Sequence, residues 1–220
     1  MSEDLAFLRL LHLADSALPV GGAAHSYGLE TLVVANRLTL QNLASYMRGI
    51  VSEVGTLEAW FCNVGHALGT QLANAGDITI AWHQQNHQLS ARKPARESRL
   101  ASLAMGRRML GILHLLYKAD LGSAPAHYCL TFGLAGGLIG ASATATTLAF
   151  LQQMLTGQIS AAQRLMSLGQ MEAQKLSWRL KASLVSAATV TGANPPPCCA
   201  PLLEVGSMQH PWLSPRLFIS

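Results

Sequence analysis

Three side chains capable of proton transfer lie close together near the start of the chain: His25, Tyr27 and Glu30. An imidazole, a phenol and a carboxylate can act as general acids or bases when they converge on a substrate. If a helix begins near Ala23, Tyr27 and Glu30 are three residues apart and share one of its faces. Two interpretations follow: a small helical enzyme that uses these groups, or solvated polar residues at a corner between helices.

Histidine spacing suggests a second kind of chemistry, metal binding. His83 and His87 are four residues apart in a segment with helical patterning, and Cys62 and His66 share that spacing. Either pair could bind one ion from a single helix face. Two ligands make only half a site, and no carboxylate or cysteine lies near His83 and His87 in the sequence. We therefore expect solvated surface histidines and assign no metal ligands, with metal carriage by these histidines kept as an alternative.

The composition is unusually apolar. Half of the 220 residues are apolar, 12% are charged, and the mean hydropathy is +0.28. Such a chain either enters a membrane or covers apolar surface with partner proteins. The longest stretch without charge, between Asp120 and Arg164, is rich in alanine, glycine and threonine and has no basic cluster tight against either end. We expect a buried helix pair in a protein assembly and no membrane span.

The charges and the cysteines indicate the cellular compartment and the class of partner. The start is acidic, at Glu3 and Asp4, whereas a signal peptide begins with positive charge. The four cysteines form no C-x-x-C pair, so we expect reduced thiols and a cytoplasmic protein. The net charge is +4, and much of the positive charge lies in one segment. Few aromatic residues accompany this basic segment, so we do not expect it to bind nucleic acid. We expect a solvated helix face or a site for an acidic protein partner. That segment contains Arg92, Lys93, Arg96, Arg99, Arg107 and Arg108.

Apolar residues recur with helical spacing along almost the whole chain, and clear alternating strands are absent. The sequence therefore predicts an all-α, single-domain multi-helix bundle. We expect helices from about Glu3 to Ala14 and from Arg96 to Lys118. We also expect Ser123, ahead of Pro125, to open the uncharged helix pair, and Gly157 with Ser160 to end it.

The chain carries two strong breaks. Pro19, Gly21 and Gly22 predict a structural loop between the first two helices. The run Asn194–Pro197 cannot be regular helix, yet the segment after it keeps apolar residues such as Trp212. We expect a helical domain at residues 1–190 and a proline-containing docking tail at 191–220, which docks on its own domain or on a partner.

Glycines in the uncharged segment form two overlapping G-x-x-x-G spacings, with Gly133, Gly136, Gly137 and Gly140. This spacing opens a groove in which another backbone can approach closely. The groove could hold a helix of the same subunit or a helix of a second copy, and we favour a dimer seam.

Four groups of residues, in order along nearly the whole chain, resemble the urease accessory protein UreF family. The first group is Leu13–Gly22 with His25–Glu30, and the second is Pro94–Glu97 with Met105–Arg108. The third is His127 and Tyr128 with Phe132–Leu134, and the last is His210, Leu213 and Arg216–Ser220.

The resemblance implies an all-helical, homodimeric cytoplasmic adaptor that is not an enzyme. It would bind UreD (also called UreH) and the GTPase UreG, and the complex would deliver nickel to apo-urease. Tyr27, Glu30 and Arg216 would contribute to the GTPase site. A tail ordered against UreD would contribute His210, Leu213, Leu217, Phe218 and Ser220. No cofactor would be tightly bound, since the assembled complex handles the nickel; a nickel-binding metallochaperone in its own right stays as the alternative.

Overall fold

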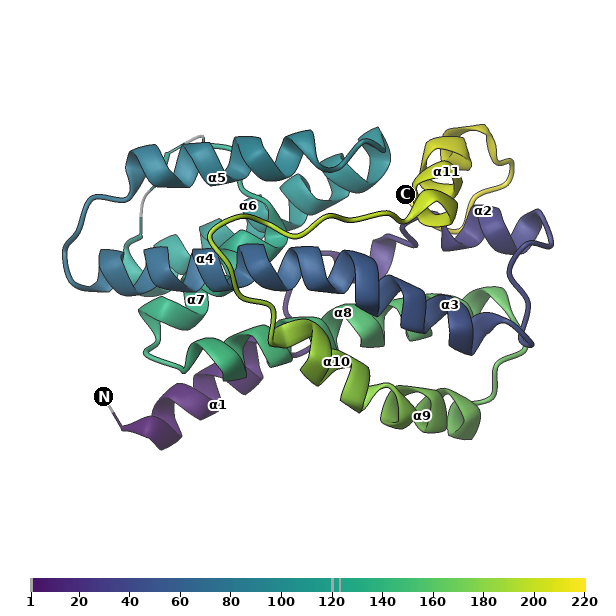
Figure 1. The fold of residues 1–220 in the computed structure, drawn as a ribbon, viewed down its shortest axis with the longest axis horizontal. Coiled ribbons are helices and arrows are strands. Elements are labelled where there is room, and N and C mark those ends of the chain that lie inside the picture. Colours follow the sequence, from purple (N-terminus) through teal and green to yellow (C-terminus); the bar gives the residue numbers. More distant parts are fainter. Residues whose placement is uncertain (1, 120, 123) are drawn as a thin grey trace.

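The computed structural model describes residues 2–119, 121–122 and 124–220, and every regular element within them is a helix, which confirms the all-α prediction (Figure 1). The α-helices are α1 (Glu3–Leu13), α2 (Leu29–Val34), α3 (Leu43–Ile50), α4 (Thr56–Ala73), α5 (Thr79–Ala91), α6 (Arg96–Tyr117), α7 (Tyr128–Leu138), α8 (Ala143–Leu165), α9 (Gln170–Arg179), α10 (Lys181–Ala188) and α11 (Pro201–Gln209). Short 3₁₀ turns lie at Gly22–Ala24 and His210–Trp212, and a π-helical turn, Val51–Gly55, joins α3 to α4.

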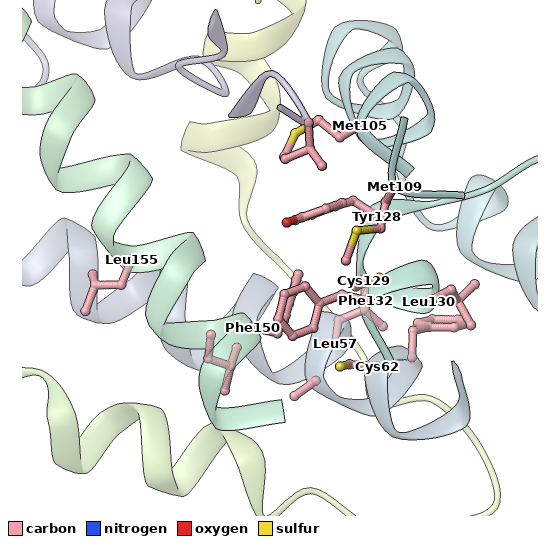
Figure 2. Close-up of a cluster of buried hydrophobic side chains, with 14 of the residues drawn as sticks. Leu57, Cys62, Met105, Met109, Tyr128, Cys129, Leu130, Phe132, Phe150 and Leu155 are labelled. Atoms are coloured by element: carbon pink, nitrogen blue, oxygen red, sulfur yellow. The ribbon is translucent and has the colours of Figure 1, made fainter. Parts of the chain in front are cut away.

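Helix α4 lies at the centre and packs against both α7 and α8. Figure 1 shows α5 and α6 along one side of this core and α9 and α10 along the other. Aromatic rings fill the space between α7 and α8 (Figure 2): the ring centroids of Phe132 and Phe150 are 5.7 Å apart, and those of Tyr128 and Phe132 are 6.1 Å apart. Tilted and edge-to-face arrangements are favoured because they bring the positive edge of one ring to the negative face of the other.

Glycines let α4 and α7 touch backbone to backbone. A Cβ at Gly133 or Gly137 would overlap the carbonyl oxygen of Cys62 or His66 on α4. In return, Gly65 on α4 faces the carbonyl of Leu130 on α7 in the same way. The G-x-x-x-G groove of α7 is thus filled by a helix of the same chain, with a matching spacing at its own glycines.

The predicted dimer seam is therefore wrong. Gly136 faces Thr146 on α8, where a Cβ would overlap the threonine side chain. Gly140 lies two residues beyond the end of α7, in the left-handed region with a φ of 71°, and is exposed. With Gly133 and Gly137 against α4, the spacing serves packing inside one chain.

The helix limits agree with the sequence where the apolar periodicity is long. Helix α6 ends within one residue of the predicted Lys118. The expected break at Gly157 and Ser160 is wrong, because α8 continues through both to Leu165. Ser123 lies outside the described residues, and α7 begins at Tyr128.

No helix in the described part of the chain combines the length and the apolar character needed to span a bilayer. The charge-free α7 is instead buried along almost its whole length by neighbouring helices. Its missing charges therefore reflect burial in protein.

The segment between α10 and α11 runs as an irregular strap across α4 (Figure 1). The indole nitrogen of Trp60 on α4 donates to the carbonyl of Gly192 at 3.0 Å. The amide of Cys199 donates to the carboxylate of Glu53, in the π-helical turn, at 3.0 Å. These two contacts direct the following residues toward α2 and α6.

We predict opposite stability effects for two glycine-to-alanine substitutions. Gly133→Ala should lower the free energy of unfolding by about 1–3 kcal/mol, since neither backbone at the α4–α7 contact can move aside cheaply. Gly157→Ala should raise it by about 0.5–1 kcal/mol, because this exposed glycine in α8 has open space around it. Urea unfolding at neutral pH measures both; equal effects would contradict the packing described.

Candidate protein-interaction site

The corner before α2 differs from the expected helix. Helix α2 begins at Leu29, not near Ala23. Tyr27 and Gly28 adopt left-handed conformations, with φ values of 52° and 85°. The predicted helix face shared by Tyr27 and Glu30 is therefore wrong: one residue precedes the helix and the other lies in its first turn.

The predicted structural loop has one position that requires glycine. Gly21 has a φ of 82°, and the guanidinium of Arg108 occupies the place where a Cβ would stand. Arg108 donates from Nη1 to the carbonyl of Val20 at 3.1 Å, which fastens the loop to α6. Gly22 begins the 3₁₀ turn, and Pro19 is exposed ahead of it.

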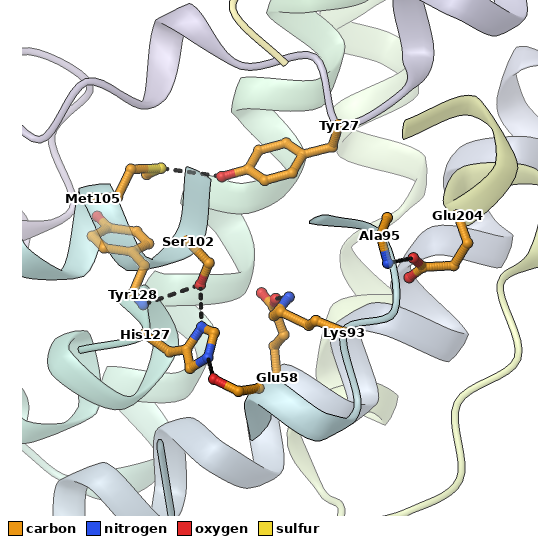
Figure 3. Close-up of polar contacts among 10 residues, drawn as sticks. Tyr27, Glu58, Lys93, Ala95, Ser102, Met105, His127, Tyr128 and Glu204 are labelled. Carbon is orange, nitrogen blue, oxygen red and sulfur yellow. Dashed lines mark hydrogen bonds and ion pairs between the residues drawn. The ribbon is translucent and has the colours of Figure 1, made fainter. Parts of the chain in front are cut away.

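Helix α11 packs directly on this corner. A Cβ at Gly28 would overlap the backbone of Gly206 and Ser207 on α11, so the two segments meet without side chains between them. The carboxylate of Glu204 on α11 accepts a hydrogen bond from the amide of Ala95, ahead of α6, at 3.0 Å (Figure 3). Helix α11 is thus held from two sides.

The carboxylate of Glu30 lies at the centre of the contact between the corner and the tail. Glu30 is only 4% exposed. It accepts hydrogen bonds from Nε2 of His210 at 2.9 Å and from the amides of Leu217 at 2.6 Å and Phe218 at 3.2 Å. A buried carboxylate must be paired in this way, so Glu30 and the tail stabilise each other.

Ser220 makes three contacts with the corner, one through its hydroxyl and two through its carbonyl. Its hydroxyl lies 2.7 Å from Nδ1 of the buried His25. Its carbonyl accepts hydrogen bonds from the amides of Ser26 and Tyr27, the latter at 3.2 Å. Residues almost two hundred positions apart in the sequence therefore form one backbone-paired unit.

Arg164 at the end of α8 clamps the tail from outside. It donates from Nη1 to the carbonyl of Ala23 at 2.8 Å, and its guanidinium carbon lies 5.6 Å from the centre of the Phe218 ring. One residue further along both segments, the amide of Ile219 donates to the carbonyl of Ala24 at 2.8 Å. One cation thus holds both the corner and the tail.

We call this unit the junction: residues 20–30 together with 201–220. Of the predicted partner-binding residues in it, Arg216 and Leu217 are exposed and Leu213 is half-buried. Glu30, His210, Phe218 and Ser220 are buried against the chain itself. Of the two alternatives for the tail, docking on its own domain is the one observed.

Tyr27 offers little to acid–base chemistry. Its hydroxyl donates to the sulfur of Met105 at 3.1 Å (Figure 3), and burial, reinforced by the charges of Glu58 and Cys129, raises its pKa. The phenol therefore stays protonated at neutral pH. The carboxylate of Glu30 already accepts hydrogen bonds from the tail. Two surface hollows, one along α5 and one beside the end of α6, are lined by neither Tyr27 nor Glu30.

A largely buried ion pair fixes the turn that binds α11. Lys93 and Glu58 form it between the α5–α6 turn and α4 (Figure 3). Burial alone would lower the pKa of Lys93, but the adjacent Glu58 carboxylate helps to raise it, so the Lys93 ammonium stays charged at neutral pH. Arg99 donates to the carbonyl of Lys93 at 2.5 Å and fixes the same turn that binds α11.

His127 connects α5, α6 and α7 inside the core. Its Nε2 lies 2.8 Å from the hydroxyl of Ser90, and its Nδ1 lies 3.0 Å from that of Ser102 (Figure 3). Burial, together with the positive charges of Lys93 and Arg99, lowers the pKa of His127 to about 3. The ring is therefore neutral at physiological pH, so one nitrogen donates and the other accepts.

The two candidate metal pairs differ in their surroundings. Burial raises the pKa of the Cys62 thiol to about 12, and Nε2 of His66 is hydrogen-bonded to the carbonyl of Ala141 at 2.8 Å. Neither group of that pair is ready to bind a metal ion. His83 and His87 lie on the outer side of α5, and no cluster of three or more metal-binding side chains occurs within the described ranges.

Several residues that hold the junction together carry no recognisable signal in the sequence. Arg108, Arg164 and Glu204 read as ordinary solvated charges on helices, and each binds a backbone group far away in the chain. The closeness of Gly28 and Gly206 is equally invisible. The one usable signal is the glycine at each position, which permits close backbone contact.

Comparison with known proteins identifies the class as urease accessory proteins. A family model described as UreF matches residues 39–181. The chain is 32% identical over 226 residues to the urease accessory protein UreF of Nostoc sp. (strain PCC 7120), covering 99% of this chain and 97% of that protein. It is 31% identical to UreF of Mycobacterium sp. (strain JLS), covering 96% and 97% of the two chains. UreF of Haemophilus influenzae (strain PittEE) is 30% identical, with 96% and 94% covered.

The chain belongs to the UreF family. The family model stops short of the junction on both sides, at residues 39 and 181. The full-length matches extend over the junction as well.

We predict that Glu30→Ala loosens the tail without unfolding the helices. The substitution removes a charged acceptor from two backbone amides and from His210, a loss of about 1.5–3 kcal/mol. Hydrogen exchange at Leu217 and Phe218 should therefore accelerate by at least about tenfold, as 1.4 kcal/mol corresponds to a factor of ten.

The matched control for this substitution is Glu172→Ala. Glu172 pairs with Lys175 at 2.7 Å on the exposed surface of α9, so its removal should leave tail exchange unchanged. Unaltered exchange in the Glu30 variant would show that the carboxylate does not hold the tail.

We predict that acid destabilises the fold through His127. The unfolded imidazole titrates near pH 6.5, whereas the folded one titrates near 3. The unfolded state therefore binds more protons between these values, and stability is lost as the pH falls through that window. From pH 6.5 to 5.5 the wild type should lose about 1 kcal/mol through this group. Urea unfolding of His127→Asn, less stable at pH 7.5, should show a shallower pH dependence; an unchanged slope would contradict the assignment.

Proposed function

We propose that this chain is an adaptor that binds UreD and the GTPase UreG and serves nickel insertion into apo-urease. Membership of the UreF family over nearly the full chain length supports this role. The observation that carries it is the junction, because a buried Glu30 fixes the backbone of the tail and leaves particular side chains facing outward.

The GTPase site that we propose combines Arg216 with the accessible edge of Tyr27. Arg216 is exposed and directly precedes the two residues whose amides bind Glu30. The amide of Tyr27 binds Ser220, so both side chains belong to the same unit. Glu30 acts in this proposal as a positioning residue: its carboxylate orders the backbone beside Arg216.

The UreD site that we propose is the outer surface of α11 and the tail. This surface is rich in large apolar side chains that remain exposed: Leu202, Val205, Met208, Trp212, Leu217 and Ile219. Leu202 and Val205 are three residues apart and share one helix face, which continues into the tail. An exposed apolar surface of this kind is typical of a protein-binding site. In this arrangement His210, Phe218 and Ser220 shape the surface from beneath.

We further propose a homodimer, a cytoplasmic setting and no tightly bound cofactor, with nickel as the cargo of the assembled complex. With the glycines of α7 used inside the chain, the dimer contact must lie elsewhere. Exposed leucines on the outward face of α1, such as Leu8, are available for a partner chain.

Co-expression with UreD and UreG followed by size-exclusion chromatography tests the proposal. We expect one complex that contains all three proteins. Arg216→Ala should weaken UreG binding by about 2 kcal/mol, roughly thirtyfold, and spare UreD. Leu217→Asp should instead weaken UreD binding. Arg179→Ala, at an exposed arginine on α9, is the control; failure of the wild type to bind either protein would refute the adaptor role.

A further inference from the structure

Two histidines on α5 remain unused by the fold and by the junction. Helix α5 buries Trp82, Asn86 and Leu89 on its inner side. His83 and His87 lie on the other side, where His87 is exposed and His83 is half-buried. Both line a shallow surface hollow whose walls come from α5 itself.

These two histidines differ from four others in the hydrogen bonding of their ring nitrogens. His25, His66, His127 and His210 each direct a ring nitrogen to a group of the protein. Within the described residues, no hydrogen bond is formed by the ring of His83 or of His87. Their lone pairs are therefore available to a ligand from solvent.

The geometry of the pair suits one shared metal ion. The ring centroids are 6.4 Å apart, and the ring planes differ by 21°. With metal–nitrogen bonds near 2.1 Å, two imidazoles bound to one ion at a right or tetrahedral angle have centroids roughly 4.5–5.3 Å apart, so the two rings must approach each other by about 1 Å to share an ion. Histidines four residues apart on one helix face are also the spacing used in metalloprotease helices. Small rotations of these two side chains can aim both nitrogens at one point, and such rotations are fast at a surface.

We propose that His83 and His87 form a two-imidazole site for a divalent first-row transition metal ion, with Ni²⁺ as the relevant cargo. Imidazole is a preferred ligand of nickel, copper and zinc. Since no third side chain of the described residues completes the site, water fills the remaining positions. The result is an open site with exchangeable ligands, suited to passing an ion on. The site itself does not depend on the adaptor role, and only the choice of nickel as cargo draws on it.

Isothermal titration of Ni²⁺ into the full chain without a histidine tag tests the proposal. Cys198→Ser and Cys199→Ser are included throughout, since both cysteines are exposed and thiolates bind nickel. We expect one ion per chain, and weaker binding as the pH falls, because protons compete for imidazole. His83→Ala and His87→Ala should each weaken binding by at least about tenfold. The double variant should lose it.

A register variant separates this site from general surface binding. Gln84→His combined with His87→Gln keeps two histidines on α5, but adjacent residues do not face each other on a helix, so Ni²⁺ binding should be lost. His114→Ala, on the surface of α6, should bind Ni²⁺ as tightly as the parent, which is the chain with only the two cysteine substitutions. Equal affinity of the parent and the register variant, or no binding by the parent at millimolar Ni²⁺, would overturn the site. Circular dichroism verifies that each variant is folded, and unchanged assembly of the double variant with UreD and UreG shows that the adaptor role stands apart.

Discussion

The fold depends on the direct contact between the backbones of α4 and α7. Gly65 and Gly69 on one helix, with Gly133 and Gly137 on the other, allow the two backbones to meet without intervening side chains. Because the two backbones are in direct contact, neither helix can shift without losing close packing along its length. Helix α7 is consequently surrounded by protein, and this explains why a chain with 12% charged residues can have a long segment with none. The high mean hydropathy thus reflects the buried helix α7 as well as large apolar side chains that stay exposed.

A second constraint connects this core to the surface: the carboxylate of Glu30 is buried and must be paired. Removing a carboxylate from water costs several kcal/mol unless hydrogen bonds replace its hydration. The tail supplies them from His210 and from two backbone amides. Because these two hydrogen bonds come from backbone amides, they leave the neighbouring tail side chains free to face outward. Arg216 and Leu217 are outward-facing for this reason.

Long helices and the existence of the tail could be predicted from the sequence because their signals are local. The apolar periodicity of α6 extends over six turns, and its limits were predicted within one residue. The break expected at Gly157 fails because a helical glycine costs only about 1 kcal/mol, which packing of α8 outweighs. The helix expected from Ala23 fails for a non-local reason. Gly28 lies against Gly206, from the other end of the chain, and this contact fixes a left-handed turn where local propensity favours helix.

The candidate site shows the same division between local and distant information. Family resemblance predicts Arg216, Leu217 and Glu30 as site residues, but it does not distinguish an outward-facing side chain from one that supports the tail from within. That distinction depends on the pairing of the Glu30 carboxylate with the amides of Leu217 and Phe218, which lie far away in the sequence. The glycine groove presents the same problem, since its spacing indicates a close helix without identifying which one; the matching Gly65 and Gly69 were the available clue.

The junction and the histidine pair on α5 are joined by the turn that contains Lys93 and Ala95. Lys93 is paired with Glu58, Arg99 holds the carbonyl of Lys93, and Ala95 binds Glu204 of α11. A coupling between two binding sites requires an element with two arrangements that both ligands bias. This turn is instead fixed in one arrangement by a buried ion pair and by hydrogen bonds from both sides. Its physical role in this structure is therefore that of a spacer, which sets the position of α5 relative to the tail.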